Sequence, residues 1–280
     1  MGAKINFIVK RSIGVAGAMF SVLSFVLSFW SWEELGASGY DKVNILIAIA
    51  LISIVISMIW TSINKRKEIW QQGNASIGVL YGDIIKIGFS KKRLKFGKRI
   101  VVIPVNTHFD TLVNDEIVAA SSLHGQWINY LCKNGETTNS INDKIQSQIL
   151  LQNLAPLHED PSKIGNPTAY PLGSIIKYNY DNTIFYLISS SEYDTNLQAH
   201  CDKEQLQNVI KSLIIFYDTF GQGYPIYIPL LGTELSRVGI SESESMQLIV
   251  DLCMLNREKI HGKVNVVVYE KHRTHVPIFE

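Results

Sequence analysis

Residues 101–108 read VVIPVNTH, a continuous apolar run that ends abruptly in side chains that form hydrogen bonds. An unbroken run of this length is typical of a strand that is buried on both faces of a largely parallel sheet. Ligands of such sheets bind beyond the carboxyl ends of the strands, where loops present polar groups. Asn106 carries both donors and an acceptor and suits ribose hydroxyls, although by itself it would equally serve to end a strand.

From about Ser76 onward, apolar runs of this kind alternate with segments of helical period. The expected strands are Gly78–Tyr81, Ile100–Val105, Ser174–Tyr178, Thr183–Ser189, Tyr224–Pro229 and Val264–Tyr269. The expected helices are Asp115–Cys132, Ser140–Asn153, Lys203–Phe220 and Ser241–Lys259. Strands that alternate with helices predict an α/β layered fold with a parallel or mixed sheet.

Two further loops at predicted strand ends carry polar groups. Asp83 follows Tyr81 and Gly82, and a carboxylate in this place either accepts from the amine of an adenine-like base or caps a helix. Residues 228–239, IPLLGTELSRVG, run from a strand to a helix, and their glycines and hydroxyls predict an anion-binding loop. This loop lacks the GK[ST] ending of a Walker motif.

Two uncharged segments precede this region, residues 12–32 and 43–63. Each is about as long as the roughly 20 residues that span a bilayer core, and the short polar stretch 33–42 joins them. They predict a transmembrane helical hairpin. The alternative for the first segment is a cleaved signal peptide, but the run is longer than a signal core and a second span follows it.

Basic residues flank both spans on the same side. Lys4, Lys10 and Arg11 lie in the N-terminal segment 1–11, and Lys65–Lys67 begin a predicted juxtamembrane linker, residues 64–75. The loop between the spans is mainly acidic. The positive-inside rule therefore predicts a multi-pass protein of the cell inner membrane with both termini in the cytoplasm.

Small and hydroxyl residues recur at helical spacing within both spans. They are Gly14, Gly17, Ala18, Ser21, Ser24 and Ser28 in the first span, and Ala50, Ser53, Ser57 and Thr61 in the second. Small residues let membrane helices approach closely, and hydroxyls form hydrogen bonds across helices. The pattern fits packing within one hairpin, and it also fits assembly of several hairpins.

The composition excludes several classes of protein. Hydrophobic residues make up 46% of the 280 positions and charged residues only 18%, against about 25% in typical soluble domains. Because 26 basic residues balance 25 acidic ones, no bulk charge favours nucleic acid. Three widely spaced cysteines fit neither a disulfide scaffold nor a zinc site. The histidines near the C-terminus, His261, His272 and His275, lack a rigid ligand pair, so no metal is expected.

The order of the three polar loops resembles that of the macro domain, an α/β/α fold that binds ADP-ribose. The resemblance covers residues 76–280. It implies that Asp83 and Ile84 read adenine, that Asn106 lies near the distal ribose, and that main-chain amides of the late loop wrap the diphosphate. The ligand-binding residues that it implies are Asp83, Ile84, Asn106, Thr107, Val113, Asn114, Gly232, Thr233, Glu234, Leu235, Ser236, Arg237 and Tyr269.

One loop departs from the macro-domain pattern. Macro domains that hydrolyse ADP-ribosyl linkages usually carry a glycine-rich loop after the asparagine, whereas residues 109–116, FDTLVNDE, contain no glycine. This difference favours a protein that reads a ligand and has no catalytic residues. It also suggests that the polar side chains from Asp110 to Glu116 face a modified distal end of the ligand.

A membrane hairpin joined to a macro domain is similar to the effector of the type II Thoeris anti-phage system. The resemblance implies a TIR-domain partner that makes a signal derived from ADP-ribose, such as histidine-ADP-ribose. It further implies a homo-oligomer, disruption of the lipid bilayer and cell death, with no cofactor or nucleic-acid partner. Two alternatives remain, a membrane-tethered ADP-ribosyl hydrolase and an adaptor that has lost ligand binding.

Overall fold

The computed structural model describes residues 2–36, 38–63, 66–91, 97–193, 199–233 and 238–278. The chain divides into a helical unit, residues 1–67 and 277–280, and an α/β unit, residues 68–276.

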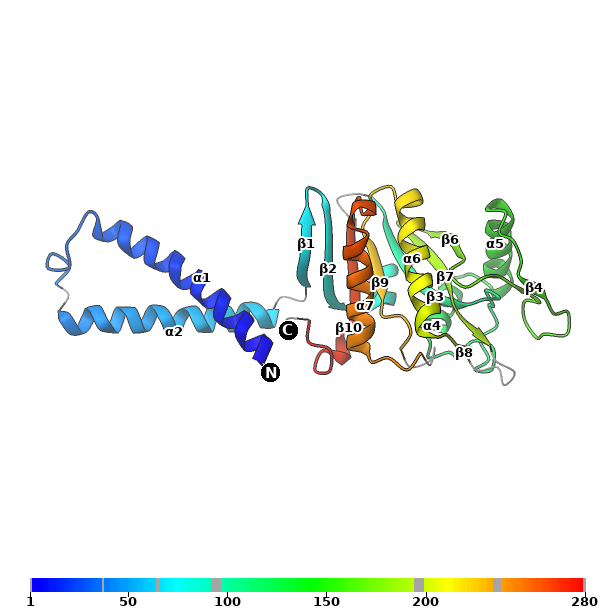
Figure 1. Cartoon of the computed structure of the whole chain (residues 1–280), viewed down its shortest axis with the longest axis horizontal. Helices are drawn as coiled ribbons and strands as arrows, with labels where there is room; N and C mark the ends of the chain where they lie inside the picture. Colours follow the sequence, from blue (N-terminus) through cyan, green and yellow to red (C-terminus); the bar gives the residue numbers. More distant parts are fainter. Residues whose placement is uncertain are drawn as a thin grey trace. The chain divides into compact units, whose positions relative to one another are not determined.

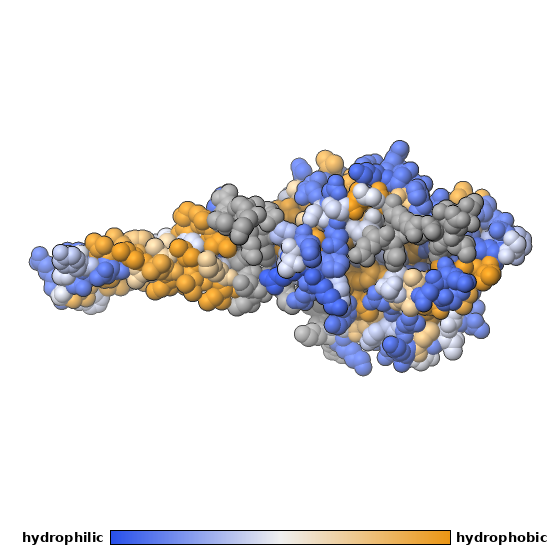
Figure 2. Space-filling model, turned by 90° about the horizontal axis from the view of Figure 1, so that it is seen from below, coloured by the Kyte–Doolittle hydropathy of each residue, from blue (hydrophilic) through white to orange (hydrophobic). Residues whose placement is uncertain are grey.

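The helical unit contains two helices that form a hairpin, α1 (Gly2–Leu27) and α2 (Gly39–Ile63). By length and composition, Ile8–Leu27 and Gly39–Ile59 are candidate membrane spans. The first helix therefore ends five residues before the predicted limit at Trp32, and Lys10 and Arg11 lie within it. Figure 2 shows the shaft of the pair as largely hydrophobic and the turn that joins the helices as hydrophilic. This distribution is the one expected of a hairpin in a bilayer.

The polar residues of the two helices lie in different environments. On α2, Ser53 and Ser57 are buried, and Ser53 Oγ lies 3.7 Å from Met19 Sδ of α1, across the hairpin. By contrast, the small residues Gly14, Gly17, Ala18, Ser21 and Ser24 of α1, and Ser28 just after its end, are all exposed, although Ser12 of α1 is buried. We call the six exposed residues the α1 small-residue face. Among the described residues, packing inside the hairpin therefore accounts for part of the α2 pattern and for none of the α1 small-residue face.

The α/β unit is built on a mixed sheet. Within the described residues the sheet has eight strands in the order β1-β2-β10-β9-β3-β7-β6, with β8 paired to β7. The strands are β1 (Arg66–Gln72), β2 (Ala75–Gly82), β3 (Arg99–Asn106), β6 (Ile175–Tyr180), β7 (Thr183–Tyr193), β8 (Ala199–His200), β9 (Ile226–Pro229) and β10 (Lys263–Tyr269). The run from β2 through β10, β9 and β3 to β7 is parallel, whereas β6 and β8 are antiparallel to β7. A separate pair, β4 (His158–Glu159) and β5 (Thr168–Ala169), is also antiparallel.

Helices cover both faces of the sheet (Figure 1). They are α3 (Ile84–Gly88), α4 (Leu123–Lys133) and α5 (Thr138–Leu151) on one face, α6 (Lys203–Phe220) and α7 (Glu242–Leu255) on the other, and the 3₁₀ turns η2 (Arg257–Lys259) and η3 (Glu270–His272). Val101, Ile103 and Val105 of β3 pack with α4 and α5, and Ile100 and Val102 on the other face are also buried. Burial of both faces explains the unbroken apolar run. The predicted α/β/α sandwich is confirmed.

Two expectations about elements were wrong. Residues 66–72, expected within a linker, form the edge strand β1. The sequence of a solvated edge strand is polar, so it resembles that of a linker. The helix expected over Asp115–Cys132 begins only at Leu123, with Ser122 as its N-cap. The eight residues 115–122, nearly half of the expected helix, are not helical, and there Asp115 Oδ1 accepts a hydrogen bond from the N–H of Ala120 at 2.7 Å.

Candidate functional site

The parallel strands bring their carboxyl ends to one edge of the sheet. In the register of β10 with its two neighbours, Tyr269 pairs with Gly82 and Val267 pairs with Pro229. The residues that follow β2 and β9 therefore lie on either side of the end of β10. Because loops at this edge are where α/β folds bind ligands, the three predicted loops meet where a site is expected.

A cleft of about 270 Å³ opens at this edge, slightly below the roughly 300–1,000 Å³ of typical small-molecule sites. We call it the strand-end cleft. Its lining residues are Gly82, Asp83, Ile84, Ser121, Leu123, Gln126, Pro229, Leu230, Thr233, Glu242, Val267, Tyr269 and His272. Four of the residues predicted from sequence are among them, namely Asp83, Ile84, Thr233 and Tyr269.

Asp83 holds the start of α3 and also lines the cleft. Its Oδ1 accepts hydrogen bonds from the N–H groups of Ile85 at 3.0 Å and Lys86 at 3.1 Å, so it is the N-cap of the helix. Its Oδ2 lies 3.7 Å from the exposed ammonium of Lys86. The two interpretations of Asp83 are therefore compatible, since one oxygen caps the helix while the side chain stays partly exposed and lines the cleft.

Tyr269 ends β10, and 41% of the residue is exposed. A large aromatic ring so exposed at a cleft is suited to stack on a planar ligand. Gly232, on the loop after β9, has a φ of +79°, and a Cβ there would lie 2.6 Å from Leu206 Cδ2. The loop is also held by Ser245, whose Oγ donates to the carbonyl of Leu231 at 2.6 Å. Glu234, Leu235, Ser236 and Arg237 lie outside the described residues.

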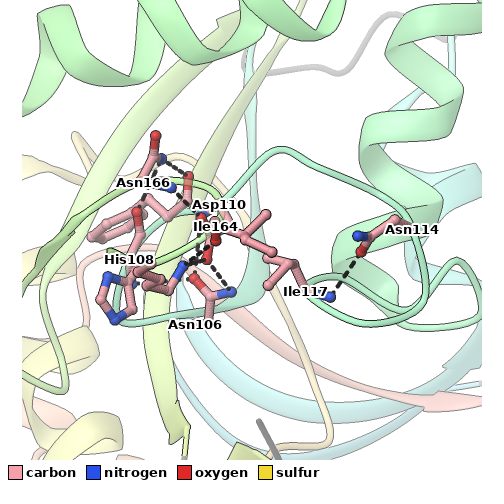
Figure 3. A network of polar contacts seen from close by, with 9 residues as sticks. Asn106, His108, Asp110, Asn114, Ile117, Ile164 and Asn166 are labelled. Atoms are coloured by element: carbon pink, nitrogen blue, oxygen red, sulfur yellow. Dashed lines mark hydrogen bonds and ion pairs between the residues drawn. The ribbon is translucent and has the colours of Figure 1, made fainter. Parts of the chain in front are cut away.

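Asn106 does not line the strand-end cleft; it organises the loop after β3 (Figure 3). Only 4% of the residue is exposed. Its Oδ1 accepts from the N–H groups of His108 and Asp110, each at 3.2 Å, and its Nδ2 donates to Asp110 Oδ2 at 3.1 Å. Thr107 is likewise buried, and its carbonyl accepts from the N–H of Tyr170 at 2.9 Å. Both residues therefore fix the shape of the loop.

Asp110 is the centre of this network. Its fully buried carboxylate also accepts from Lys163 Nζ at 2.8 Å and from the N–H of Asn166 at 2.6 Å (Figure 3). Gly165 approaches so closely that a Cβ on it would lie 2.3 Å from Asp110 Oδ1. Charge-assisted hydrogen bonds of this kind are stronger than neutral ones. The segment 160–167 is thus fastened to the loop after β3.

Val113 and Asn114 lie further along the same loop. Val113 forms a bridge with Val118, and Asn114 Oδ1 accepts from the N–H groups of Glu116 at 3.1 Å and Ile117 at 2.8 Å. The hypothesis that polar side chains from Asp110 onward replace bare backbone toward a ligand does not hold for Asp110, which is buried, nor for Asn114 Oδ1, which is bonded to the backbone.

Two histidines beside this loop are buried. Desolvation lowers the pKa of His108, and it lowers that of His124 to about 3, partly offset by a hydrogen bond of His124 to the backbone of Asp110. Both imidazoles are therefore neutral near pH 7. Burial raises the pKa of Cys201 to about 11 and that of Cys253 to about 12, so neither thiol is a reactive thiolate. The described part of the chain contains no group of three or more residues placed to hold a metal.

One part of the cleft is not predicted by any sequence motif. His272 Nδ1 and Glu242 Oε1 are hydrogen-bonded there, and residues from the start of α4 complete the wall. His272 was considered only within a group of C-terminal histidines. Its contact with a residue 30 positions earlier depends on the return of β10 beside β9, and no local pattern indicates it.

Comparison with known proteins decides the family. The family model described as "Thoeris protein ThsA, Macro domain" matches residues 77–269, more than two thirds of the chain. The chain belongs to this family. The match contains Asp83, Asn106, the loop after β9 and Tyr269.

Relatives of this ThsA macro-domain chain are distant in sequence. "Thoeris protein ThsA" of Bacillus amyloliquefaciens (strain Y2) is 23% identical over 241 residues, which cover 84% of this chain and 76% of the relative. Matching solved structures include a mutant Oceanobacillus iheyensis macrodomain with ADPR, at 12% identity and a TM-score of 0.46, covering 73% of this chain and 90% of that one. Another is the Oceanobacillus iheyensis macrodomain with ADP, at 13% identity and a TM-score of 0.41, covering 74% and 90%.

Proposed function

We propose that the chain is a membrane effector of anti-phage defence whose strand-end cleft binds a signal derived from ADP-ribose. The observation that carries the proposal is the meeting of Asp83 and Tyr269 in one cleft, at the ends of the adjacent strands β2 and β10 of a ThsA macro domain. Asp83 supplies a hydrogen-bond acceptor for an exocyclic amine, and Tyr269 supplies a face on which a base stacks.

In this proposal the ligand extends from Asp83 across the end of the sheet. Adenine lies against Asp83, the backbone of Ile84 and Tyr269, and the diphosphate lies at the loop from Gly232 to Arg237. The distal ribose lies toward the loop after β3. There Asn106, Thr107, Val113 and Asn114 act by shaping the loop, because the described hydrogen bonds of Asn106 and Asn114 are made within it.

The distal group is proposed to be histidine, so that the signal is histidine-ADP-ribose made by a TIR-domain partner. The proposal takes the chain to be a reader with no hydrolase activity. It is supported by the loop after β3, whose carboxylate Asp110 is fully buried in an ion pair, which removes it as a general base. The alternative of a hydrolase predicts turnover when the protein is incubated with ADP-ribosylated substrates.

Membrane action is proposed to follow from assembly. In this account α1 and α2 span the cell inner membrane with both termini in the cytoplasm. Ligand binding promotes a homo-oligomer in which α1 small-residue faces pack together, and the assembly disrupts the bilayer. Support comes from the exposure of that face on α1 and from the open space around Gly14 and Gly17, where an added Cβ would meet nothing within 4 Å.

The test is a calorimetric titration of the detergent-solubilised chain with ADP-ribose. Asp83→Asn keeps an N-cap side chain on α3 but replaces the Oδ2 acceptor with a donor. We expect roughly 10- to 100-fold weaker binding, the loss typical of a hydrogen bond to a charged group, with an unchanged melting temperature. Glu258→Gln, on the exposed turn η2, is the matched control. Equal affinity of Asp83→Asn and the wild type would contradict the proposed site.

A further inference from the structure

The Glu242–His272 pair is the part of the strand-end cleft that the proposed function leaves unused. Glu242 lies in the first turn of α7 and His272 is the last residue of η3, just after β10. His272 Nδ1 is hydrogen-bonded to Glu242 Oε1, with 33% and 22% of the respective side chains exposed. The pair therefore joins the two sides of the cleft and remains accessible to a ligand.

The partner of Nδ1 decides what the other ring nitrogen offers. An ionised carboxylate only accepts hydrogen bonds, so Nδ1 carries the hydrogen that Glu242 accepts. In the neutral imidazole Nε2 is then an acceptor. The same arrangement orients histidines in many functional sites, where a carboxylate holds one nitrogen and sets the tautomer of the ring.

The ring of His272 also lies at a defined angle to the aromatic face of the cleft. The centroids of the Tyr269 and His272 rings are 5.5 Å apart, and the planes are inclined by 79°. The two rings thus form a corner. A planar base that lies in the corner against Tyr269 places its edge, where its polar groups are, within reach of the imidazole.

We propose that His272, oriented by Glu242, accepts a hydrogen bond from the amino group of the bound base. The inference rests on the proposed function. An exocyclic amine has two N–H bonds, and Asp83 Oδ2 and His272 Nε2 provide one acceptor for each. The cleft thereby selects a 6-amino purine over a 6-oxo purine. The oxygen of a 6-oxo purine is itself an acceptor, and it would face two acceptors without a donor.

The segment after His272 is held close to the same site. The guanidinium of Arg273 lies 5.0 Å from the ring centroid of Tyr81, and Tyr81 Oη donates to the carbonyl of Val276 at 2.8 Å. Tyr81 is two residues before Asp83 on β2. These contacts fix the segment that carries His272, which limits the entropy lost when a base binds.

The test compares ADP-ribose with inosine diphosphate ribose by calorimetry on the full chain in detergent. His272→Phe keeps an aromatic ring beside Tyr269 but removes both nitrogens, and Glu242→Gln weakens the hold on Nδ1. We expect His272→Phe to bind ADP-ribose roughly tenfold more weakly and to lose most of the preference for ADP-ribose over the inosine analogue. Glu242→Gln shows a smaller loss of both. Asp251→Asn, on the exposed side of α7, is the control and matches the wild type.

The ratio of the two affinities separates contact with the base from a structural role, because a damaged cleft loses affinity for both ligands equally. Wild-type preference for ADP-ribose that survives in His272→Phe would overturn this inference and leave the proposed function standing. Failure of the wild type to bind either nucleotide would overturn both.

Discussion

Asp110 holds a negative charge where water does not reach it, and its three partners come from two different segments. Asp110→Asn removes that charge and leaves the ammonium of Lys163, of whose side chain only 9% is exposed, without its counter-ion. We expect the free energy of unfolding to fall by about 3–5 kcal/mol, as is usual when one partner of a buried pair is removed. Urea titration of the solubilised chain measures it.

The control for this variant is Asp181→Asn. Asp181 is exposed in the turn between β6 and β7 at a φ of +46°, a conformation that asparagine also tolerates. The Asp181→Asn variant is expected to unfold at the same urea concentration as the wild type. An Asp110→Asn midpoint equal to that of the wild type would show that the network contributes nothing to stability.

The buried His124 is expected to make the stability of the fold depend on pH. Its pKa is about 3 in the fold and about 6.5 in an unfolded chain, so the unfolded state binds more protons between these values. Stability contributed by the neutral ring is therefore present above about pH 6.5 and is lost as the pH falls toward 3. The lowered pKa of His108 acts in the same direction. We expect the melting temperature of His124→Gln to fall less steeply than that of the wild type as the pH is lowered from about 6.5 toward 3. An equally steep fall in the two proteins would contradict this.

At the scale of elements, two hydroxyl residues of the predicted spans lie in different surroundings. Ser24 is exposed on α1, whereas Ser57 of α2 is fully buried. Ser24→Leu is therefore expected to abolish dye release from liposomes while ADP-ribose binding stays intact, because it blocks contact between hairpins. Ser57→Leu overpacks the hairpin itself and is expected to lower the yield of folded protein.

Val22→Leu is the matched control on α1, since Val22 is 66% exposed and the change adds bulk outside the small-residue face. Its dye release should equal that of the wild type. Full release by Ser24→Leu would mean that the α1 small-residue face is not the contact between hairpins.

Elements with strong periodic patterns were predicted well from sequence. The bounds of α6 were predicted as observed, and β3 was placed within one residue at each end, because an amphipathic helix and a doubly buried strand leave local signals. The helix start at Leu123 was not predicted, since side-chain bonds of Asn114 and Asp115 to nearby backbone override helical propensity. The polar strand β1 was missed for lack of an apolar face.

Site residues, too, could be predicted only where a local sequence pattern marks them. Asp83 and Tyr269 were found because each directly follows or ends a recognisable strand. The role of Asn106 depends on Asp110, which is itself held by Lys163, 53 positions further along the chain. The position of His272 depends on Glu242, 30 positions earlier. Contacts of this range are set by the topology of the sheet, and a local motif does not encode them.

For the whole molecule, we propose that ligand binding in the α/β unit promotes assembly of the helical unit. In the sequence, α2 ends at Ile63 and the edge strand β1 begins at Arg66. A ligand shifts an assembly equilibrium only if it binds the assembled state more tightly. We expect ADP-ribose to raise the mass of the solubilised chain measured by light scattering. The mass of the Asp83→Asn variant is expected to stay unchanged at the same ligand concentration. Equal mass with and without ligand, starting from a monomer, would contradict the coupling.

A crystal or cryo-EM structure of the chain with ADP-ribose tests the proposed ligand site most directly. We expect nucleotide density in the strand-end cleft, with the base against Tyr269 and its amine within hydrogen-bond distance of Asp83 Oδ2. Nucleotide density at another surface, or a cleft that stays empty at saturating ligand, would contradict it.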